Sequence, residues 1–340
     1  MLDVCLPGTG GMLPLPNRWL TCCWIEHQGA AILIDCGEGT QIALKKAGLK
    51  PARIELLLIT HFHADHVSGL PGILLTLANS ARTQPLTIAG PVGLKRIVSA
   101  LTVIAPRLPF PLEIIELQFS RTVKSDQPTA GSPIATSVPC TPKPLYLQNV
   151  GGHDAGYRAS SREKTSPVKI TALPLRHGVN CLGYRIELSR KPVFNPDKAK
   201  SLDVPVKFYK HLHSGESVTL DNGRIILPEQ VLDGIRRPIS VCYFTDTKPF
   251  PQMIDFAKDV DLLISEGMYY DERMREKIDE KNHMLFSDSA KLASKCGAKR
   301  LWLTHYSPAL ERPHDGTKAV QKIFPQTTIS NDGEMLTIAE

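Results

Sequence analysis

Short apolar runs that end in polar or charged residues recur along the sequence. The runs at 30–35, 54–59, 168–173, 239–245 and 301–304 are rich in leucine and β-branched residues, which is typical of buried strands. Residues 19–26 and 30–35 predict a hairpin that turns at Gln28-Gly29, and residues 68–79 and 92–105 predict helices. Strands that alternate with helices indicate an α/β protein in which helices pack on the outer faces of the sheets.

One of these runs leads directly into a cluster of imidazoles and a carboxylate. Residues 54–59 are followed by Thr60 and then by His61-Phe62-His63-Ala64-Asp65-His66. Neutral imidazoles and carboxylates are ligands that Zn²⁺ and similar ions prefer. In an extended turn His61 and His63 point to the same side and can share one metal ion, while Asp65 and His66 can face a second. Two-metal sites hydrolyse phosphorus or carbonyl centres. The alternative is a solvated histidine-rich loop.

Three other strand ends carry candidate site residues. His177 follows the run 168–173 at the position of a further ligand, although a lone histidine there is more often structural. Asp246 follows the run 239–245, and an aspartate there can bridge two cations because each oxygen can bind one. Asp35 ends the run 30–35 and either orients a ligand histidine or caps the helix that begins near Thr40. Strand ends converge at one edge in α/β folds, so these side chains are expected to lie together.

Composition and charge narrow the class of protein only slightly. With 340 residues, of which 42% are hydrophobic and 22% charged, the chain can bury a core as one large domain or two smaller ones. No stretch approaches the roughly 18 apolar residues of a membrane span, and residues 1–4 begin a strand-like run without signal-peptide features. These observations predict a cytoplasmic protein with no membrane partner. The eight cysteines include no C-x-x-C pair and are expected to be reduced, and the net charge of +6 permits a polyanionic partner without requiring one.

Two segments interrupt the alternation of strands and helices. Residues 120–168 are rich in proline, serine, threonine and glycine, and predict a surface insertion that is partly disordered. Residues 190–213 carry six Lys/Arg against two aspartates, with aromatic residues interleaved. Basic residues beside exposed rings suit an RNA backbone and unstacked bases, while a solvated loop is the alternative. His211 and His213 have ligand-like spacing but lie in this segment, outside the predicted site.

The histidine cluster also resembles a known family. The stretch from His61 to His66 matches the H-x-H-x-D-H signature of the metallo-β-lactamase fold, and Leu70-Pro71-Gly72 resembles its ribonuclease Z branch. Residues 32–40 resemble the family's I-L-x-D-C-G-E-G-T element. The resemblance covers nearly the whole chain outside residues 120–168. It implies a single α/β domain over residues 1–340, folded as a metallo-β-lactamase αββα sandwich with a protruding basic arm at 190–213.

The same resemblance implies a complete set of metal ligands. Thr245-Asp246-Thr247 resembles the family's G-D-T motif with threonine in place of the glycine, and His305 matches its fifth motif. The implied site holds two zinc ions per chain, one bound by His61, His63 and His177, the other by Asp65, His66 and His305, with Asp246 between them. Water activated by the metal ions would then attack a phosphodiester.

Two further residues are predicted to be catalytic beside Asp65. Residues 262–268 resemble the family's L-I-H-E-A-T element with Ser265 in the histidine's place, so Glu266 occupies the glutamate position. His283 matches a family histidine that precedes the last ligand motif. Departure of a ribose 3′-oxygen needs a proton, which we expect His283 to donate while Glu266 holds its imidazolium. The alternative is that His283 caps a helix.

The function that the resemblance implies is zinc-dependent endonucleolytic removal of the 3′ trailer from precursor tRNA by a homodimer. The arm departs from the family, because residues 202–208 read L-D-V-P-V-K-F where an L-G-I-P-P-G-P run is expected. The alternative is a metallo-phosphodiesterase that acts on small or cyclic phosphoesters. A catalytically silent nucleic-acid-binding protein is disfavoured because every ligand position is filled.

Overall fold

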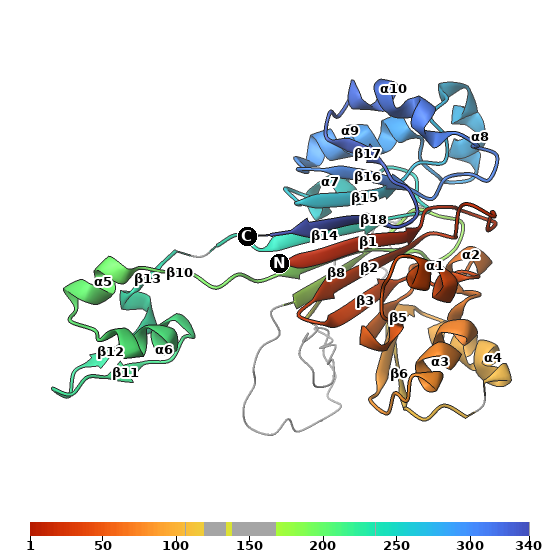
Figure 1. Cartoon of the computed structure of the whole chain (residues 1–340). Coiled ribbons are helices and arrows are strands. Elements are labelled where there is room, and N and C mark those ends of the chain that lie inside the picture. The colour runs from red at the N-terminus through yellow and green to blue at the C-terminus, as the bar shows by residue number, and fades with distance from the viewer. Residues whose placement is uncertain (106, 119–133, 138–167, 235, 340) are drawn as a thin grey trace. The chain divides into compact units, whose positions relative to one another are not determined.

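Two seven-stranded sheets pack together at the centre of the computed structural model (Figure 1). The first contains β1 Leu2–Gly8, β2 Cys22–His27, β3 Ala30–Ile34, β4 Ile54–Leu58, β5 Leu86–Pro91, β6 Leu112–Leu117 and β18 Glu334–Ile338, in the order β18-β1-β2-β3-β4-β5-β6. The second contains β7 Ile134–Ser137, β8 Val168–Pro174, β9 Leu182–Leu188, β14 Ile239–Phe244, β15 Leu262–Glu266, β16 Leu301–Thr304 and β17 Thr327–Ile329, in the order β17-β16-β15-β14-β9-β8-β7. Hydrogen bonds from Tyr184 Oη to the Ile59 carbonyl and between the Thr21 and Thr304 hydroxyls join the two sheets.

The structure describes residues 1–105, 107–118, 134–137, 168–234 and 236–339. They divide into two compact units, one formed by Met1–Glu187 with Ser240–Glu340 and the other by Leu188–Ile239. We call the first the sheet unit and the second the arm unit. Each has its own buried apolar cluster, so each is described by itself.

Helices cover the outer face of each sheet in the sheet unit, as the orange and blue ribbons of Figure 1 show. On the first sheet lie α1 Thr40–Lys46, α2 Ala64–Val67, α3 Leu70–Asn79 and α4 Leu94–Leu101, with the short 3₁₀ turns Pro51–Arg53 and Thr102–Ile104. On the second lie α7 Gln252–Phe256, α8 Arg275–Glu280, α9 Phe286–Cys296 and α10 Thr317–Gln321, with the 3₁₀ turns Glu272–Met274 and Pro313–Gly316. Apolar side chains of these helices complete the two cores. The predicted αββα sandwich is therefore confirmed.

The central strands are buried on both faces, which explains their continuous apolar runs. In β4 the side chains of Leu56, Leu57 and Leu58 are all buried, because helices cover one face of the sheet and the second sheet covers the other. Strands β3, β4 and β5 pair in parallel, and so do β14, β15 and β16. Their carboxyl ends therefore lie at a common edge of each sheet.

The predicted helices at 68–79 and 92–105 form, but with different bounds. Helix α3 begins at Leu70 with Pro71 in its first turn, where the missing proline N–H has no helical partner to lose. Gly93 has φ +103°, a left-handed conformation that cannot continue a helix, so α4 begins only at Leu94. The end of the second predicted helix is the 3₁₀ turn Thr102–Ile104.

The arm unit is larger than the basic segment at 190–213. It consists of β10 Val193–Phe194, α5 Pro196–Ser201, α6 Tyr209–His213, β11 Val218–Thr219, β12 Ile225–Ile226 and β13 Leu232–Asp233, with 3₁₀ turns at Val206–Phe208 and Pro228–Gln230. Its buried cluster is Ala199, Val204, Leu212, Val218, Leu220, Ile226 and Val231. Residues 214–239 supply four of these seven side chains, so the segment 190–213 could not bury its apolar residues alone.

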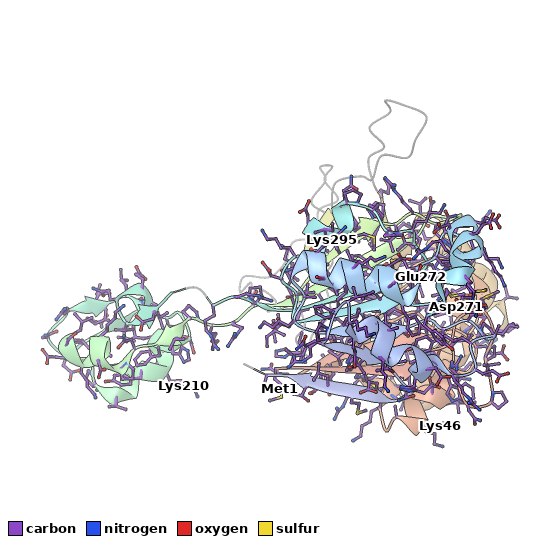
Figure 2. All side chains as sticks on the ribbon, turned by 90° about the horizontal axis from the view of Figure 1, so that it is seen from above. Met1, Lys46, Lys210, Asp271, Glu272 and Lys295 are labelled. Atoms are coloured by element: carbon purple, nitrogen blue, oxygen red, sulfur yellow. The ribbon has the colours of Figure 1, made fainter. Side chains whose placement is uncertain are left out.

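The surface of the arm unit is basic, as the sequence predicts. Its aromatic side chains, which the sequence predicts to be exposed, are instead partly buried. Lys191, Lys207 and Lys210 are exposed, and Figure 2 shows Lys210 at the surface of the unit. Phe194 and Tyr209 are half-buried, lie 4.7 Å apart between ring centroids and pack on the apolar cluster. The aromatic residues therefore stabilise the unit, and the lysines form the surface that a polyanion can reach.

Three further predictions concern the insertion, the cysteines and a membrane span. The predicted insertion at 120–168 lies outside the described residues, except for β7, which pairs antiparallel with β8, and Val168. The seven cysteines within the described ranges are buried and free of disulfides. Within those ranges no helix is long and apolar enough to span a bilayer.

Candidate metal centre

The predicted site residues of the sheet unit follow the carboxyl ends of six strands. Asp35 follows β3, His61 to His66 follow β4, His177 follows β8, Asp246 follows β14, Glu266 ends β15, and His305 follows β16. Parallel pairing of β3 with β4 and of β14 with β15 and β16 places these ends at one edge of each sheet. The predicted convergence therefore occurs.

A first group of possible ligands is formed by His61, His63, His177 and Asp246, whose ligating atoms all lie within 4.8 Å of one another. The nearest nitrogens of His63 and His177 are 3.3 Å apart. His63 is exposed and His177 half-buried, so this group can be reached from solvent. Burial and the neighbouring His66 lower the pKa of His61 to about 2, and burial lowers the pKa of His177 to about 4, so both rings are neutral at pH 7.

A second group consists of Asp65, His66 and His305, which are all buried. The Nε2 atoms of His66 and His305 lie 3.3 Å apart, and Asp65 Oδ2 lies 3.5 Å from each of them. Asp246 lies between the two groups, with Oδ2 at 3.2 Å from His66 Nε2 and Oδ1 at 3.9 Å from His61 Nε2. Its two oxygens can therefore face two different cations.

These side chains fit divalent metal ions. In the described part of the chain, His61 Nε2 is buried without a hydrogen-bond partner, which is unusual for a polar atom unless it has another role. Burial opposes ionisation of Asp246, but His305 and His66 hold its pKa well below the usual range. Neutral imidazoles grouped with ionised carboxylates form a donor set that binds transition-metal cations.

Asp35 orients a ligand histidine, and does not cap the helix that follows it. Its Oδ2 accepts a hydrogen bond from His66 Nδ1 at 2.8 Å, which directs Nε2 of that ring towards Asp246 and His305. Helix α1 instead has Gly39 at its N-cap, with no side-chain cap. Of the two interpretations left open by the sequence, the structure supports the first.

Backbone conformations at the strand ends are part of the site. Asp35, Asp246 and His305 have φ values of +62°, +54° and +58°, although non-glycine residues rarely adopt the left-handed region. Gly11 lies so close to His305 that a Cβ there would meet the imidazole at 2.8 Å. The backbone N–H of Met12 then donates to Asp65 Oδ2 at 2.6 Å. The turn that follows β1 and contains Gly11 thus supports both Asp65 and His305.

Glu266 and His283 form a buried pair beside Asp246. His283 Nδ1 lies 2.7 Å from Glu266 Oε2, and Glu266 Oε1 accepts the Thr247 N–H at 2.7 Å. Burial opposes charge on His283, but Glu266 raises its pKa to about 9. The imidazole contacts Glu266 and lies 3.8 Å from Asp246 Oδ1, so the structure gives no support to a helix cap. His283 also lies close enough to Asp246 and His305 to form a third possible ligand group, although its Nδ1 is already engaged.

Two histidines outside the predicted site and two threonines inside it complete the comparison with the sequence. His211 and His213 belong to the arm unit, where they contact Glu216 and the Pro192 carbonyl, in agreement with their exclusion from the site. Sequence reasoning missed Thr60 and Thr247, which hydrogen-bond to the site carboxylates Asp35 and Glu266. Each is the sequence neighbour of a predicted ligand, His61 or Asp246, and nothing else in the sequence indicates that they support the site.

Comparisons with known proteins agree with this geometry. A family model described as "Beta-lactamase superfamily domain" matches residues 233–306, and one described as "Anti-Pycsar protein Apyc1" matches residues 2–96. Ribonuclease Z of Agathobacter rectalis is 41% identical over 334 residues, which cover 98% of this chain and 97% of that protein. Ribonuclease Z of Lachnospira eligens is 42% identical over 333 residues, covering 98% and 96%. The crystal structure of the short form of human tRNase Z has the same fold, with a TM-score of 0.64, 22% identity and coverage of 99% and 100%.

The position of Asp246 predicts that both metal sites depend on it. Asp246→Ala should lower the divalent metal retained after dialysis, because the remaining ligands would leave the repulsion between two cations poorly screened. Metal content per chain measures this. Asp259→Ala is a matched control, since Asp259 also has positive φ (+53°) but is exposed and outside both groups, and it should retain metal normally. Equal metal content in the two variants would contradict the bridging position.

Proposed function

This chain belongs to the ribonuclease Z family, and we propose that its two ligand groups hold two zinc ions that serve cleavage of precursor tRNA. The function is endonucleolytic processing of tRNA at its 3′ side, and the observation that carries it is similarity to ribonuclease Z proteins over nearly the full length of both chains. We assign His61, His63 and His177 to one ion, Asp65, His66 and His305 to the other, and Asp246 to both.

Zinc is supported by the composition of the donor set. Five imidazoles and two carboxylates suit Zn²⁺ better than Mg²⁺ or Ca²⁺, which prefer oxygen ligands. When bound, such ions activate a water molecule near neutral pH and neutralise charge on the phosphodiester. The role that we propose for Asp65, whose Oδ2 accepts the Met12 N–H, is to orient the attacking water.

The leaving group needs a proton that the carboxylates cannot supply. A ribose 3′-oxygen departs as a strongly basic alkoxide unless an acid protonates it in the transition state. His283 is our candidate for this acid, because Glu266 occupies its Nδ1 and stabilises its positive charge, which leaves the Nε2 proton to be donated. We propose that His283 is the general acid and that Glu266 holds it in position.

The arm unit is suited to contact the body of the tRNA. Lys191, Lys207 and Lys210 are exposed and outside the ion pairs found in the described residues, whereas Lys198 is paired with Asp233. Unpaired lysines raise affinity for RNA by displacing counterions from phosphates. Since precursor tRNA is the substrate, we also propose a cytoplasmic location.

A phosphodiesterase of small or cyclic phosphoesters is the alternative, because the same metal centre could serve it. The two functions differ in their substrates. Cleavage of a precursor tRNA at its 3′ side, with mapped products, supports the tRNA-processing function. Turnover of a small diester by a preparation that leaves precursor tRNA intact would favour the alternative.

The first prediction of this function concerns the leaving group. His283→Ala should keep both zinc ions yet lose roughly 10²- to 10⁴-fold in precursor tRNA cleavage, the usual contribution of a general acid. A diester with a p-nitrophenolate leaving group needs no proton and should be cleaved almost normally. The measurement is kcat/KM on both substrates, with His314→Ala as control because the His314 side chain is exposed and, among the described residues, bonds only Asn331. Equal losses on both substrates would remove His283 from the proton transfer.

The second concerns the arm unit. Replacing Lys191, Lys207 and Lys210 together by alanine should weaken precursor tRNA binding and lower the slope of log K against log salt by about one unit per lost phosphate contact. Turnover of the small diester should not change. Replacing Lys295, Lys318 and Lys322 instead, which are exposed in the sheet unit, makes the same change in net charge and is the control. Similar binding losses in both variants would indicate a general charge effect and no arm contact.

The third concerns assembly. We propose a homodimer and place Val103 and Ile104 at its interface, because these adjacent apolar residues are 72% and 73% exposed and a second chain could bury them. Light scattering should give the mass of two 37.5 kDa chains for the wild type and of one for Ile104→Asp. A monomeric wild type at micromolar concentration would contradict the dimer.

A further inference from the structure

Thr60 is the residue directly before the first predicted ligand, and it is fully buried between Asp35 and His61. Its hydroxyl oxygen lies 2.8 Å from Asp35 Oδ2 and 3.1 Å from His61 Nδ1. Its backbone N–H also donates to Asp35 Oδ1 at 2.8 Å. One residue therefore joins the carboxylate at the end of β3 to an imidazole of the first ligand group.

The direction of these hydrogen bonds follows from the number of hydrogens. An ionised carboxylate only accepts, and a hydroxyl has a single hydrogen to donate. The Thr60 hydroxyl therefore donates to Asp35, and its lone pair is left to face His61. A hydrogen bond between Thr60 Oγ1 and His61 Nδ1 then requires the imidazole hydrogen to be on Nδ1.

The consequence for His61 is a fixed tautomer. With hydrogen on Nδ1, the lone pair of the neutral ring is on Nε2, the atom that is buried without a hydrogen-bond partner in the described residues and lies 3.9 Å from Asp246 Oδ1. Asp35 acts in the same way on the second group, where its Oδ2 accepts from His66 Nδ1. A single carboxylate thus contacts one histidine directly and another through Thr60.

We propose that Thr60 is a positioning residue for the metal centre, whose hydroxyl carries the orienting effect of Asp35 to His61 and keeps Nε2 of that ring available as a ligand. This inference rests on the proposed metal centre. Asp35 and Thr60 together then support both ligand groups. Loss of the Thr60 hydroxyl would affect only His61 in the first group, whereas loss of the Asp35 carboxylate would affect His61 and also His66 in the second.

Removing the hydroxyl should weaken metal binding without removing a ligand. In Thr60→Val the side chain keeps nearly the same shape, but the buried Nδ1–H of His61 loses its acceptor. The ring can then place its hydrogen on Nε2, and a metal ion must displace it. Loss of a partner that orients a ligand typically reduces metal affinity by about 10- to 100-fold.

The experiment compares three variants with the wild type. Thr60→Val removes the hydroxyl, and Thr60→Ser keeps it. Thr245→Val is the matched control, because the Thr245 hydroxyl is equally buried but has no hydrogen-bond partner within the described ranges. Zinc affinity is measured by competition with a chelator of known affinity. The tautomer of His61 in the metal-free protein is read from ¹⁵N chemical shifts after histidine labelling.

We expect Thr60→Val to lower the affinity for one of the two zinc ions by about 10- to 100-fold, with Thr60→Ser and Thr245→Val near the wild type. We expect hydrogen on Nδ1 of His61 in the wild type and a mixture of tautomers in Thr60→Val. Normal zinc affinity in Thr60→Val, or an equal loss in Thr60→Ser or Thr245→Val, would overturn the proposal.

Two further outcomes separate this inference from the metal centre itself. If Thr60→Val does not fold, the wild-type spectrum still decides, because hydrogen on Nε2 of His61 would contradict the proposed role of Thr60. If the wild type binds no zinc at all, the metal assignment fails, whereas normal zinc binding that is insensitive to Thr60 contradicts only the positioning role.

Discussion

Asp246 is a buried carboxylate surrounded by imidazoles from several strand ends. Its oxygens lie 3.2 Å from His66 Nε2, 3.4 Å from His305 Nε2 and 3.9 Å from His61 Nε2. A charge so deeply buried is stable only if positive charge lies next to it. His305 and His66 already hold the pKa of Asp246 well below its usual range, and metal ions between the imidazoles would supply positive charge at the same place. The parallel strands of two sheets, the positive φ of Asp246 and the close packing of the glycine turn all serve to hold this group together.

Two other buried carboxylates, Asp35 and Glu266, each hold different histidines of the site. Asp35 lies behind the histidines and fixes their orientation, directly at His66 and through Thr60 at His61. Glu266 holds His283, whose Nδ1 contacts this carboxylate and lies 3.8 Å from Asp246 Oδ1. Activation of the nucleophile and protonation of the leaving group are thereby assigned to different residues. This separation suits a reaction that must expel a basic ribose oxygen.

The sequence predicts which side chains meet at the strand ends because their positions follow from a simple rule. Each lies at or just after the end of an apolar run, and parallel strands bring such ends to one edge. The long-range hydrogen bonds that support the ligands are not predictable in this way. The Met12 N–H reaches Asp65 only because the turn after β1 folds against His305, and no local pattern encodes that distance. Likewise, the arm unit extends to Ile239 because a few scattered apolar residues, such as Val218 and Ile226, complete its core only in three dimensions.

The central claim is that two metal ions lie at the strand ends and share Asp246. Anomalous diffraction at the zinc absorption edge, from crystals of the zinc-loaded protein, tests it most directly. We expect two peaks, one among the nitrogens of His61, His63 and His177 and the other among Asp65, His66 and His305, with a carboxylate oxygen of Asp246 next to each. A single peak, or two peaks of which only one has Asp246 as a ligand, would contradict the shared two-metal centre.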